Sequence, residues 1–375
     1  MGLNAFFTYS VVFGMGVSWQ FALTAILVEG ILFLLMSIFD VRENIFNSIP
    51  SSLRLGISGG IGLFITLIGL LNSNMVVKDA STGLTRFSFN TGVPFNSVGI
   101  TVVLTFIGII ITACLVINNI KGGIFFGIIA TWVLGIVCEV MGWYVPDAEL
   151  GMYTLFPHFS GFSIPSLKPT FCQFDFMEVF QHMGTFLIVM FTFFFGDCFD
   201  TIGTLMGVAT SSDLLDENGK LPRLKQALIA DAVATGVGAL LGTSTTTSFV
   251  ESKTGTEVGG RTGLTAIVVG LLFVASIVLS PIFLAIPSFA TAPALIMVGV
   301  MMTKSFSDID RSDLREFIPA FICFIAMPFM YSIAEGISMG IISYVLINAL
   351  TGKAKKVHPI MYVLAVLFVA RYAFL

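Results

Sequence analysis

Two aspartates within an apolar stretch are the residues of this sequence best suited to chemistry. The segment FFFGDCFDTIGTLMG contains Asp197, Asp200, Thr201 and Thr204. On a helix this spacing forms one polar stripe on a surface otherwise made of Phe, Leu, Ile and Met. An aspartate at the centre of a membrane helix costs about 2.5–3.5 kcal/mol, and of two neighbouring carboxylates one is expected to hold a proton. The stripe therefore favours a proton-coupled site over a structural polar seam, which hydroxyl side chains would provide at lower cost.

A second polar segment, TTTSFVESKTGTEVGGRTGLTAI, begins at Thr245 and interrupts apolar sequence. Its hydroxyl run favours an extended chain, whereas Glu251 followed by Gly255 and Gly259 suits a short, closely packed helix. Backbone that is not helical survives at membrane depth only inside protein or beside a cavity. We therefore expect an extended segment and a half-helix, with the Glu251 carboxylate near a helix N-terminus and ready to accept hydrogen bonds. A solvated external loop is the alternative.

A third polar side chain, Asn4, lies in MGLNAFF and offers both a donor and an acceptor. It belongs to an apolar segment, residues 2–13, that is too short to span a membrane and is closed by Gly14 and Gly16. We expect this segment to be a half-helix like the one at Glu251.

Composition defines the elements that must position these residues. The 375 residues are 56% hydrophobic and only 11% charged, against about 25% charged in soluble domains. The sequence therefore predicts an all-α polytopic membrane protein. A nucleic-acid partner is excluded because no basic tract exists beyond residues 353–356. The five cysteines show no metal-ligand spacing and the three histidines are isolated, so we expect no metal and no cofactor.

Eleven apolar segments have a length suited to membrane helices. They are residues 18–39, 51–71, 97–118, 122–143, 182–207, 226–242, 262–280, 289–304, 316–331, 333–350 and 358–374. If both short segments cross as half-spans, thirteen basic residues, among them Arg42, fall in loops on one side of the membrane and three on the other. This distribution satisfies the positive-inside rule. The sequence assigns no specific role to Glu29, Glu139 or Glu335.

An internal repeat follows from two similar heptapeptides, ALTAILV from Ala22 and GLTAIVV from Gly263. Each follows a short glycine-broken segment, and the charge count gives the two helices opposite directions, as in inverted-repeat transporters. We expect a first repeat over residues 1–143, an extracytoplasmic connection over 144–181, a second repeat over 182–350 and an extra C-terminal helix over 351–375. The two heptapeptides are 241 residues apart, and at this offset the first repeat lacks the two helices with which the second repeat opens. This predicts an N-terminal truncation or a mis-assigned gene start.

Four motifs, GLNAFF, FDTIGTL, TSTTTSFVES and GGRTGLTA, resemble those of the AzgA-type purine permeases in the nucleobase transporter superfamily. The resemblance runs from Met1 almost to the C-terminus. It implies two inverted seven-helix repeats divided into core and gate domains, homodimers, and proton-driven uptake of hypoxanthine, guanine and adenine by an elevator-like motion. It also implies a multi-pass protein of the bacterial cytoplasmic membrane, with a purine base, a proton and the lipid bilayer as partners.

The same resemblance assigns the site residues. Asn4 matches the family's asparagine in the first half-helix, Asp197 and Asp200 match its Asp-x-x-Asp pair, and Glu251 matches its base-binding glutamate. We therefore expect Glu251 and Asp197 to bind the base, Asn4 to position it and Asp200 to couple the proton. Supporting roles are expected for Gly2, Thr201 and Ser252.

Three other functions are alternatives to a proton-driven purine permease. An anion transporter of the same fold is disfavoured because the Glu251 carboxylate would oppose an anion. An intramembrane aspartyl protease needs aspartates on two facing helices, whereas Asp197 and Asp200 share one helix and Phe occupies position 194, so we expect no enzyme. A non-functional permease fragment is the third alternative.

Overall fold

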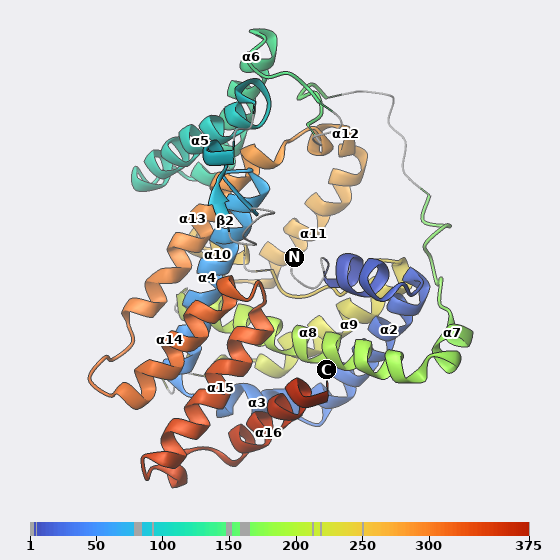
Figure 1. The fold of residues 1–375 in the computed structure, drawn as a ribbon, viewed down its shortest axis with the longest axis vertical. Coiled ribbons are helices and arrows are strands. Elements are labelled where there is room, and N and C mark those ends of the chain that lie inside the picture. Colours follow the sequence, from blue (N-terminus) through green and yellow to red (C-terminus); the bar gives the residue numbers. More distant parts are fainter. Residues whose placement is uncertain are drawn as a thin grey trace. The chain divides into compact units, whose positions relative to one another are not determined.

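The computed structural model describes residues 4, 6–78, 85–91, 94–147, 152–157, 166–211, 214–217, 220–249 and 251–374. The chain divides into two compact units, each built from both halves of the sequence (Figure 1). The first unit contains Met1–Leu63, Ser166–Lys253 and Met302–Leu375. The second contains Phe64–Pro165 and Thr254–Met301. All the predicted site residues fall within the first unit.

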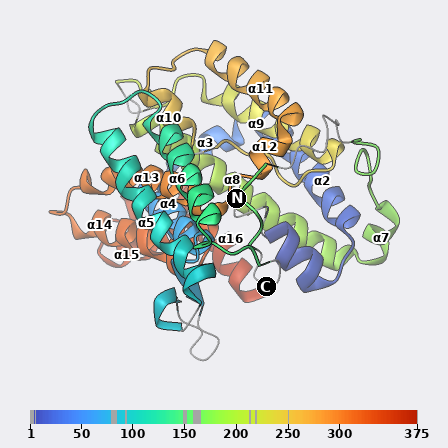
Figure 2. The same cartoon turned by 90° about the horizontal axis from the view of Figure 1, so that it is seen from above.

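Helices make up most of both units, as the view from above also shows (Figure 2). In chain order the elements are η1 (Phe6–Gly14), α2 (Trp19–Ile38), α3 (Val41–Ser48), α4 (Ser51–Asn72), β1 (Val76–Lys78), β2 (Thr85–Phe87), η2 (Ser88–Thr91), η3 (Phe95–Gly99), α5 (Ile100–Ile117), α6 (Gly123–Val140), α7 (Phe176–Gln181), α8 (Met183–Ser211), α9 (Leu224–Leu241), α10 (Ser252–Glu257), α11 (Gly263–Val278), α12 (Ser280–Leu284), α13 (Ser288–Ser307), α14 (Leu314–Phe329), α15 (Ile333–Leu350), η4 (Ala354–Lys356) and α16 (Pro359–Phe374). The strands β1 and β2 form one antiparallel hairpin.

Each of the eleven predicted membrane segments corresponds to a helix whose ends lie within about four residues of the prediction. Within the described ranges, eight helices are long and apolar enough to cross a membrane, and α11 and α16 are shorter apolar helices. The sequence did not predict the short helices α3, α7 and α12 or the β1–β2 hairpin. These elements are too short to produce a periodic apolar pattern.

The order of the elements repeats within the chain. After the short helix η1, the first half runs α2, α3, α4, α5 and α6. After the short helix α10, the second half runs α11, α12, α13, α14 and α15, again with a short helix between its first two long ones. The β1–β2 hairpin is inserted only in the first half. This repeated order agrees with the internal repeat predicted from the two heptapeptides.

The short helix η1 ends at the predicted glycines. It stops at Gly14, and Gly16 adopts a φ of +68°, a left-handed conformation that favours glycine. Ser18 then caps α2 by accepting a hydrogen bond from the Phe21 amide at 3.1 Å, and its hydroxyl donates to Glu178. The chain therefore breaks between a short helix and a full-length one, as the sequence predicts.

The second break also has the predicted form. Helix α9 ends at Leu241, its C-cap Gly242 has a φ of +86°, and residues 243–249 then form neither helix nor strand. The Thr235 hydroxyl holds this segment against α9 by donating to the Thr246 carbonyl at 2.9 Å. The six-residue helix α10 follows. The extended segment and the short helix expected around Glu251 are both present.

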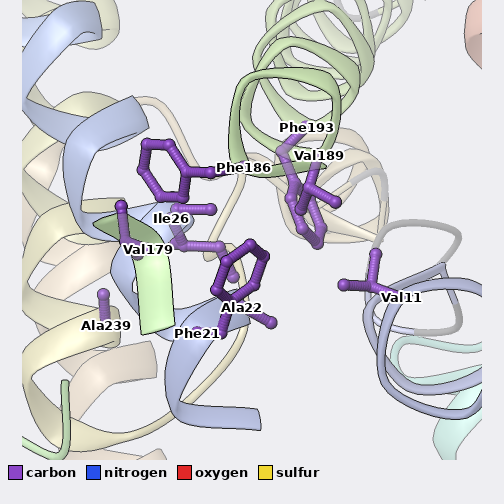
Figure 3. Close-up of a cluster of buried hydrophobic side chains, with 10 residues drawn as sticks. Val11, Phe21, Ala22, Ile26, Val179, Phe186, Val189, Phe193 and Ala239 are labelled. Atoms are coloured by element: carbon purple, nitrogen blue, oxygen red, sulfur yellow. The ribbon is translucent and has the colours of Figure 1, made fainter. Parts of the chain in front are cut away.

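An apolar cluster fixes η1 to the rest of its unit (Figure 3). Its buried members are Val11, Phe21, Ala22, Ala25, Ile26, Val179, Phe186, Val189, Phe193 and Ala239, from η1, α2, α7, α8 and α9. The rings of Phe21 and Phe186 meet edge to face with centroids 5.7 Å apart, and Phe7 of η1 lies 6.3 Å from Phe193. This packing holds η1 beside the helix that carries the two aspartates.

Helices α2 and α9 approach closely at Gly30, which gives a first prediction. A Cβ atom on Gly30 would lie 2.9 Å from the backbone nitrogen of Gly236, whereas a Cβ atom on Gly236 meets nothing within 4 Å. We expect Gly30→Ala to lower stability by about 1–3 kcal/mol through overpacking. Gly236→Ala is the matched control and is expected to be neutral or mildly stabilising. Thermal unfolding of both variants in detergent checks this; equal loss in both would contradict the close approach.

Candidate functional site

The polar stripe of α8 faces the interior of its unit. Asp197 and Thr201 are fully buried and Thr204 is nearly so, while Asp200 is only partly buried. The two aspartates therefore differ in environment, although they are one turn apart on the same helix. Oδ2 of Asp197 has no hydrogen-bond partner among the described residues. It is an acceptor that a ligand's N–H or O–H can use.

A buried ion pair lies next to this stripe. Arg42 of α3 donates from Nη2 to Oδ2 of Asp231 of α9 at 3.0 Å, and from Nη1 to the Leu228 carbonyl at 3.3 Å. Its guanidinium carbon lies 4.0 Å from the centroid of the Phe33 ring. The side chains of both charged residues are essentially inaccessible to solvent. The prediction that Arg42 lies in a loop is wrong, because the residue belongs to the short helix α3, which turns it inward.

Thr201 links the stripe to the ion pair. Its Oγ1 lies 3.0 and 3.1 Å from the two carboxylate oxygens of Asp231 and 3.4 Å from Oδ1 of Asp197. A hydroxyl group carries one proton, so it donates to only one carboxylate at a time. When it donates to Asp231, the contact with Asp197 becomes a hydrogen bond only if Asp197 is protonated and donates to Oγ1. The arrangement therefore has room for a proton on Asp197.

Asp231 also fixes the extended segment that precedes α10. The Ser248 amide donates to its Oδ1 at 3.2 Å. Asp231 thus accepts from Arg42, Thr201 and Ser248, which are an opposite charge, a hydroxyl and a backbone amide from three parts of the chain. Such complete hydrogen bonding is typical of an ionised carboxylate. Asp231 is the acceptor around which α3, α8 and the extended segment are organised.

The other predicted site residues lie at the beginning of α10 and in the N-terminal segment. Glu251 is exposed in the turn before α10, and its charge acts on that of Asp200. Ser252 is exposed and its amide donates to the Phe249 carbonyl at 3.2 Å. Asn4 is exposed, and Gly2 lies outside the described residues. Of the predicted site residues, the structure therefore brings Asp197 and Thr201 into direct contact.

Two acidic residues near the stripe were not predicted from the sequence to belong to the site. Asp231 is the one charged residue in the apolar run 226–242, so the insertion cost that drew attention to Asp197 applies to it equally. Glu29 of α2 is fully buried, and Asp197, Arg42 and Asp231 are the charged groups that act on it. We refer to Glu29, Arg42, Asp197 and Asp231 as the buried charge cluster.

Comparisons with known proteins agree with this architecture. A family model described as Permease family (Xan_ur_permease) matches residues 1–365. The guanine/hypoxanthine permease PbuG of Bacillus subtilis (strain 168) is 42% identical over 377 residues, which covers all of this chain and 80% of PbuG. The adenine permease AdeP of Escherichia coli (strain K12) is 40% identical over 382 residues, covering all of this chain and 79% of AdeP.

A solved structure has a similar fold. The transmembrane domain of the cyanobacterial bicarbonate transporter BicA aligns with a TM-score of 0.59, over 91% of this chain and 80% of that domain, at 13% sequence identity. The membrane helices and the two short helices are those of a polytopic all-α membrane protein, and the family match together with the similar permeases makes its class that of a transporter. The chain belongs to the Permease family, because the family model covers nearly its whole length.

Proposed function

We propose that this protein is a symporter that imports purine bases (hypoxanthine, guanine and adenine) together with protons. One observation carries the proposal: the fully buried Asp197 carboxyl keeps an oxygen without a hydrogen-bond partner among the described residues. A buried acceptor of this kind is costly unless a ligand or a proton satisfies it. The purine permeases PbuG and AdeP, to which the chain is similar, point to a base as that ligand.

The chemistry of the predicted residues suits a purine. A purine base is a flat heterocycle with adjacent donors and acceptors on its edges. In this proposal Asp197 and Glu251 accept N–H groups of the base, Asn4 uses its amide to position it, and phenylalanine rings stack on its faces. Thr201 orients Asp197, and Gly2 and Ser252 support the two short helices. Asp200, one turn from Asp197 on α8, couples the proton.

The uptake experiment separates this proposal from transport of an inorganic anion. We expect cells that lack their own purine uptake, when they express this chain, to accumulate labelled hypoxanthine, guanine or adenine but neither uracil nor sulfate. The fold alone is compatible with an anion, since BicA is a bicarbonate transporter. Accumulation of sulfate or bicarbonate without purine would replace the purine proposal by the anion alternative. No uptake of either kind would favour the non-functional fragment.

Glu251→Gln tests the placement of the short helix at the site. The substitution keeps the shape of the side chain but removes its charge and one acceptor. We expect purine affinity to fall by about 1–3 kcal/mol, the value of one charge-assisted hydrogen bond. Glu217→Gln, an exposed glutamate outside the helices, is the matched control and should bind as the parent does. Competition binding with each purine measures both, and an unchanged affinity in Glu251→Gln would remove α10 from the site.

A further inference from the structure

Glu29 is a buried acid for which the transport site described above has no use. It lies in the middle of α2 and has no exposed surface. Neither Oε1 nor Oε2 has a hydrogen-bond partner among the described residues. The next residue, Gly30, packs against the backbone of Gly236, so α2 cannot move away to admit a partner at this level without losing that contact. An unpartnered ionised carboxylate in such surroundings costs several kcal/mol.

The charges of the buried charge cluster do not balance. Arg42 and Asp231 form a hydrogen-bonded pair that is neutral as a unit. In the described part of the chain, Glu29 and Asp197 then have no counter-charge of their own, and each has at least one buried oxygen without a hydrogen-bond partner. If both were ionised, the cluster would carry two uncompensated negative charges. The interior therefore accommodates these two carboxyl groups with protons bound to one or both.

The elements packed on α2 carry several charged groups in the surroundings of Glu29. Helix α8 contributes Asp197 and the thiol of Cys198, α9 contributes Asp231, and α3 contributes Arg42. Helix α7 contributes Glu178, whose carboxylate accepts hydrogen bonds from Ser18, and its N-cap Asp175, whose carboxylate accepts one from the Glu178 amide. The short helix η1 has no acidic or basic residue. Among the described cations of these elements, Arg42 is the one that acts on Glu29, and it is engaged with Asp231. Lys225 of α9 pairs instead with Asp40, beyond the C-terminal end of α2.

A proton fits this site better than a metal cation does. The described His, Cys, Asp and Glu side chains form no group of three that could hold a metal ion, so the three carboxyl groups of the cluster do not converge on one point. The Arg42 guanidinium also lies among them and repels a second cation. A proton needs only one carboxyl oxygen, and Glu29 offers two.

We propose that Glu29 binds the proton whose gradient drives transport, which extends the proposed symport to a residue outside the substrate contacts. When Glu29 and Asp197 are both ionised, their negative charges repel each other and the site binds the base poorly. When Glu29 takes up one proton from solution, the pair keeps a single negative charge on Asp197, which then accepts a hydrogen bond from a purine N–H. Proton binding at Glu29 and purine binding at Asp197 then favour each other, and by linkage each raises the affinity for the other.

The experiment measures purine affinity against pH, in sodium-free buffer and with added sodium, for the whole chain in detergent. For the parent we expect affinity to fall by up to about tenfold per pH unit above the value at which Glu29 ionises, the slope of one linked proton. Glu29→Gln mimics the protonated form, so its affinity should be high and independent of pH. In vesicles it should exchange purine between preloaded compartments but lose accumulation driven by an inward proton gradient.

Two further variants keep the result interpretable. Glu29→Asp retains a titratable group and should restore part of the pH dependence, which a purely structural role for Glu29 would not explain. Glu139→Gln makes the same change in α6, where the carboxylate accepts hydrogen bonds from Thr154 and the Leu155 amide, and should keep the parent's profile.

Three results would overturn the inference. The first is parent-like pH dependence in Glu29→Gln, and the second is an affinity of the parent that follows sodium instead of pH. The third is the absence of purine binding by the parent, which would overturn the proposed function as well. The first two leave purine transport intact, so failure of the inference is distinguishable from failure of the proposed function.

Discussion

Arg42→Met is expected to destabilise the unit that carries the site by about 3–5 kcal/mol, because it leaves Asp231 buried without its opposite charge. Asp231 would keep its hydrogen bonds from Thr201 and the Ser248 amide but lose the Nη2 donor at 3.0 Å. The stacking of the guanidinium on Phe33 would be lost as well. Thermal unfolding in detergent, followed by size-exclusion chromatography of heated samples, measures the loss.

A second substitution separates the lost charge from lost packing. In Arg42→Met/Asp231→Asn the neutral amide still offers an acceptor to Ser248 and Thr201, and no buried charge is left unpaired. We expect the double variant to recover most of the lost stability, because replacing both members of a buried pair is often nearly neutral. If it is no more stable than Arg42→Met, the ion pair is not the reason that Arg42 is buried.

An exposed ion pair in the same unit provides the control. Lys225 lies 2.7 Å from Asp40, and both side chains are substantially exposed. Ion pairs in solvent contribute about 0–1 kcal/mol, so Lys225→Met should change the unfolding temperature little. A loss equal to that of Arg42→Met would mean that burial does not set the cost of breaking these pairs.

The membrane helices could be predicted from the sequence because their signal is local. About 20 consecutive apolar residues are needed to cross the hydrocarbon core, and the glycines at positions 14, 16 and 242 mark breaks that the chain makes in the structure. The half-helix at Glu251 was predictable for the same reason. It is a polar interruption in a segment whose neighbours are long apolar helices.

The buried charge cluster could not be predicted as a unit, because its members are brought together by packing between distant segments. Arg42 and Asp231 are 189 residues apart in the chain. Arg42 follows an apolar span immediately, where basic residues are usually solvated. The structure places it inward because α3 begins at Val41, one residue after Asp40 adopts a left-handed φ of 59°. The apolar sequence around Asp231 did signal a buried charge, but not its partner.

Removing the charge of Asp197 is expected to impair purine binding, whereas removing that of Asp200 is expected to impair proton coupling. Asp197 is fully buried, with Thr201 at one oxygen and no hydrogen-bond partner at the other among the described residues, and in the proposed function this second oxygen accepts from the base. Asp197→Asn should weaken purine binding by about 1.5–3 kcal/mol, the value of a hydrogen bond to a charged group. Asp200 is only partly buried and lies one turn from Asp197 on the same helix. It is therefore better placed to pass a proton than to hold the base.

Asp200→Asn should retain purine binding and exchange between preloaded vesicles, while losing accumulation driven by an inward proton gradient. The amide resembles a permanently protonated carboxyl, so no proton can be taken up and released there, whereas the contacts to the base remain. The measurement is vesicle uptake with and without the gradient, for Asp197→Asn, Asp200→Asn and the parent. If Asp200→Asn accumulates purine as the parent does, the proton does not pass through Asp200 and coupling is left to Asp197 and Glu29. If Asp197→Asn binds purine normally, the base is not held by this carboxyl, and the unpartnered oxygen of Asp197 serves the proton alone.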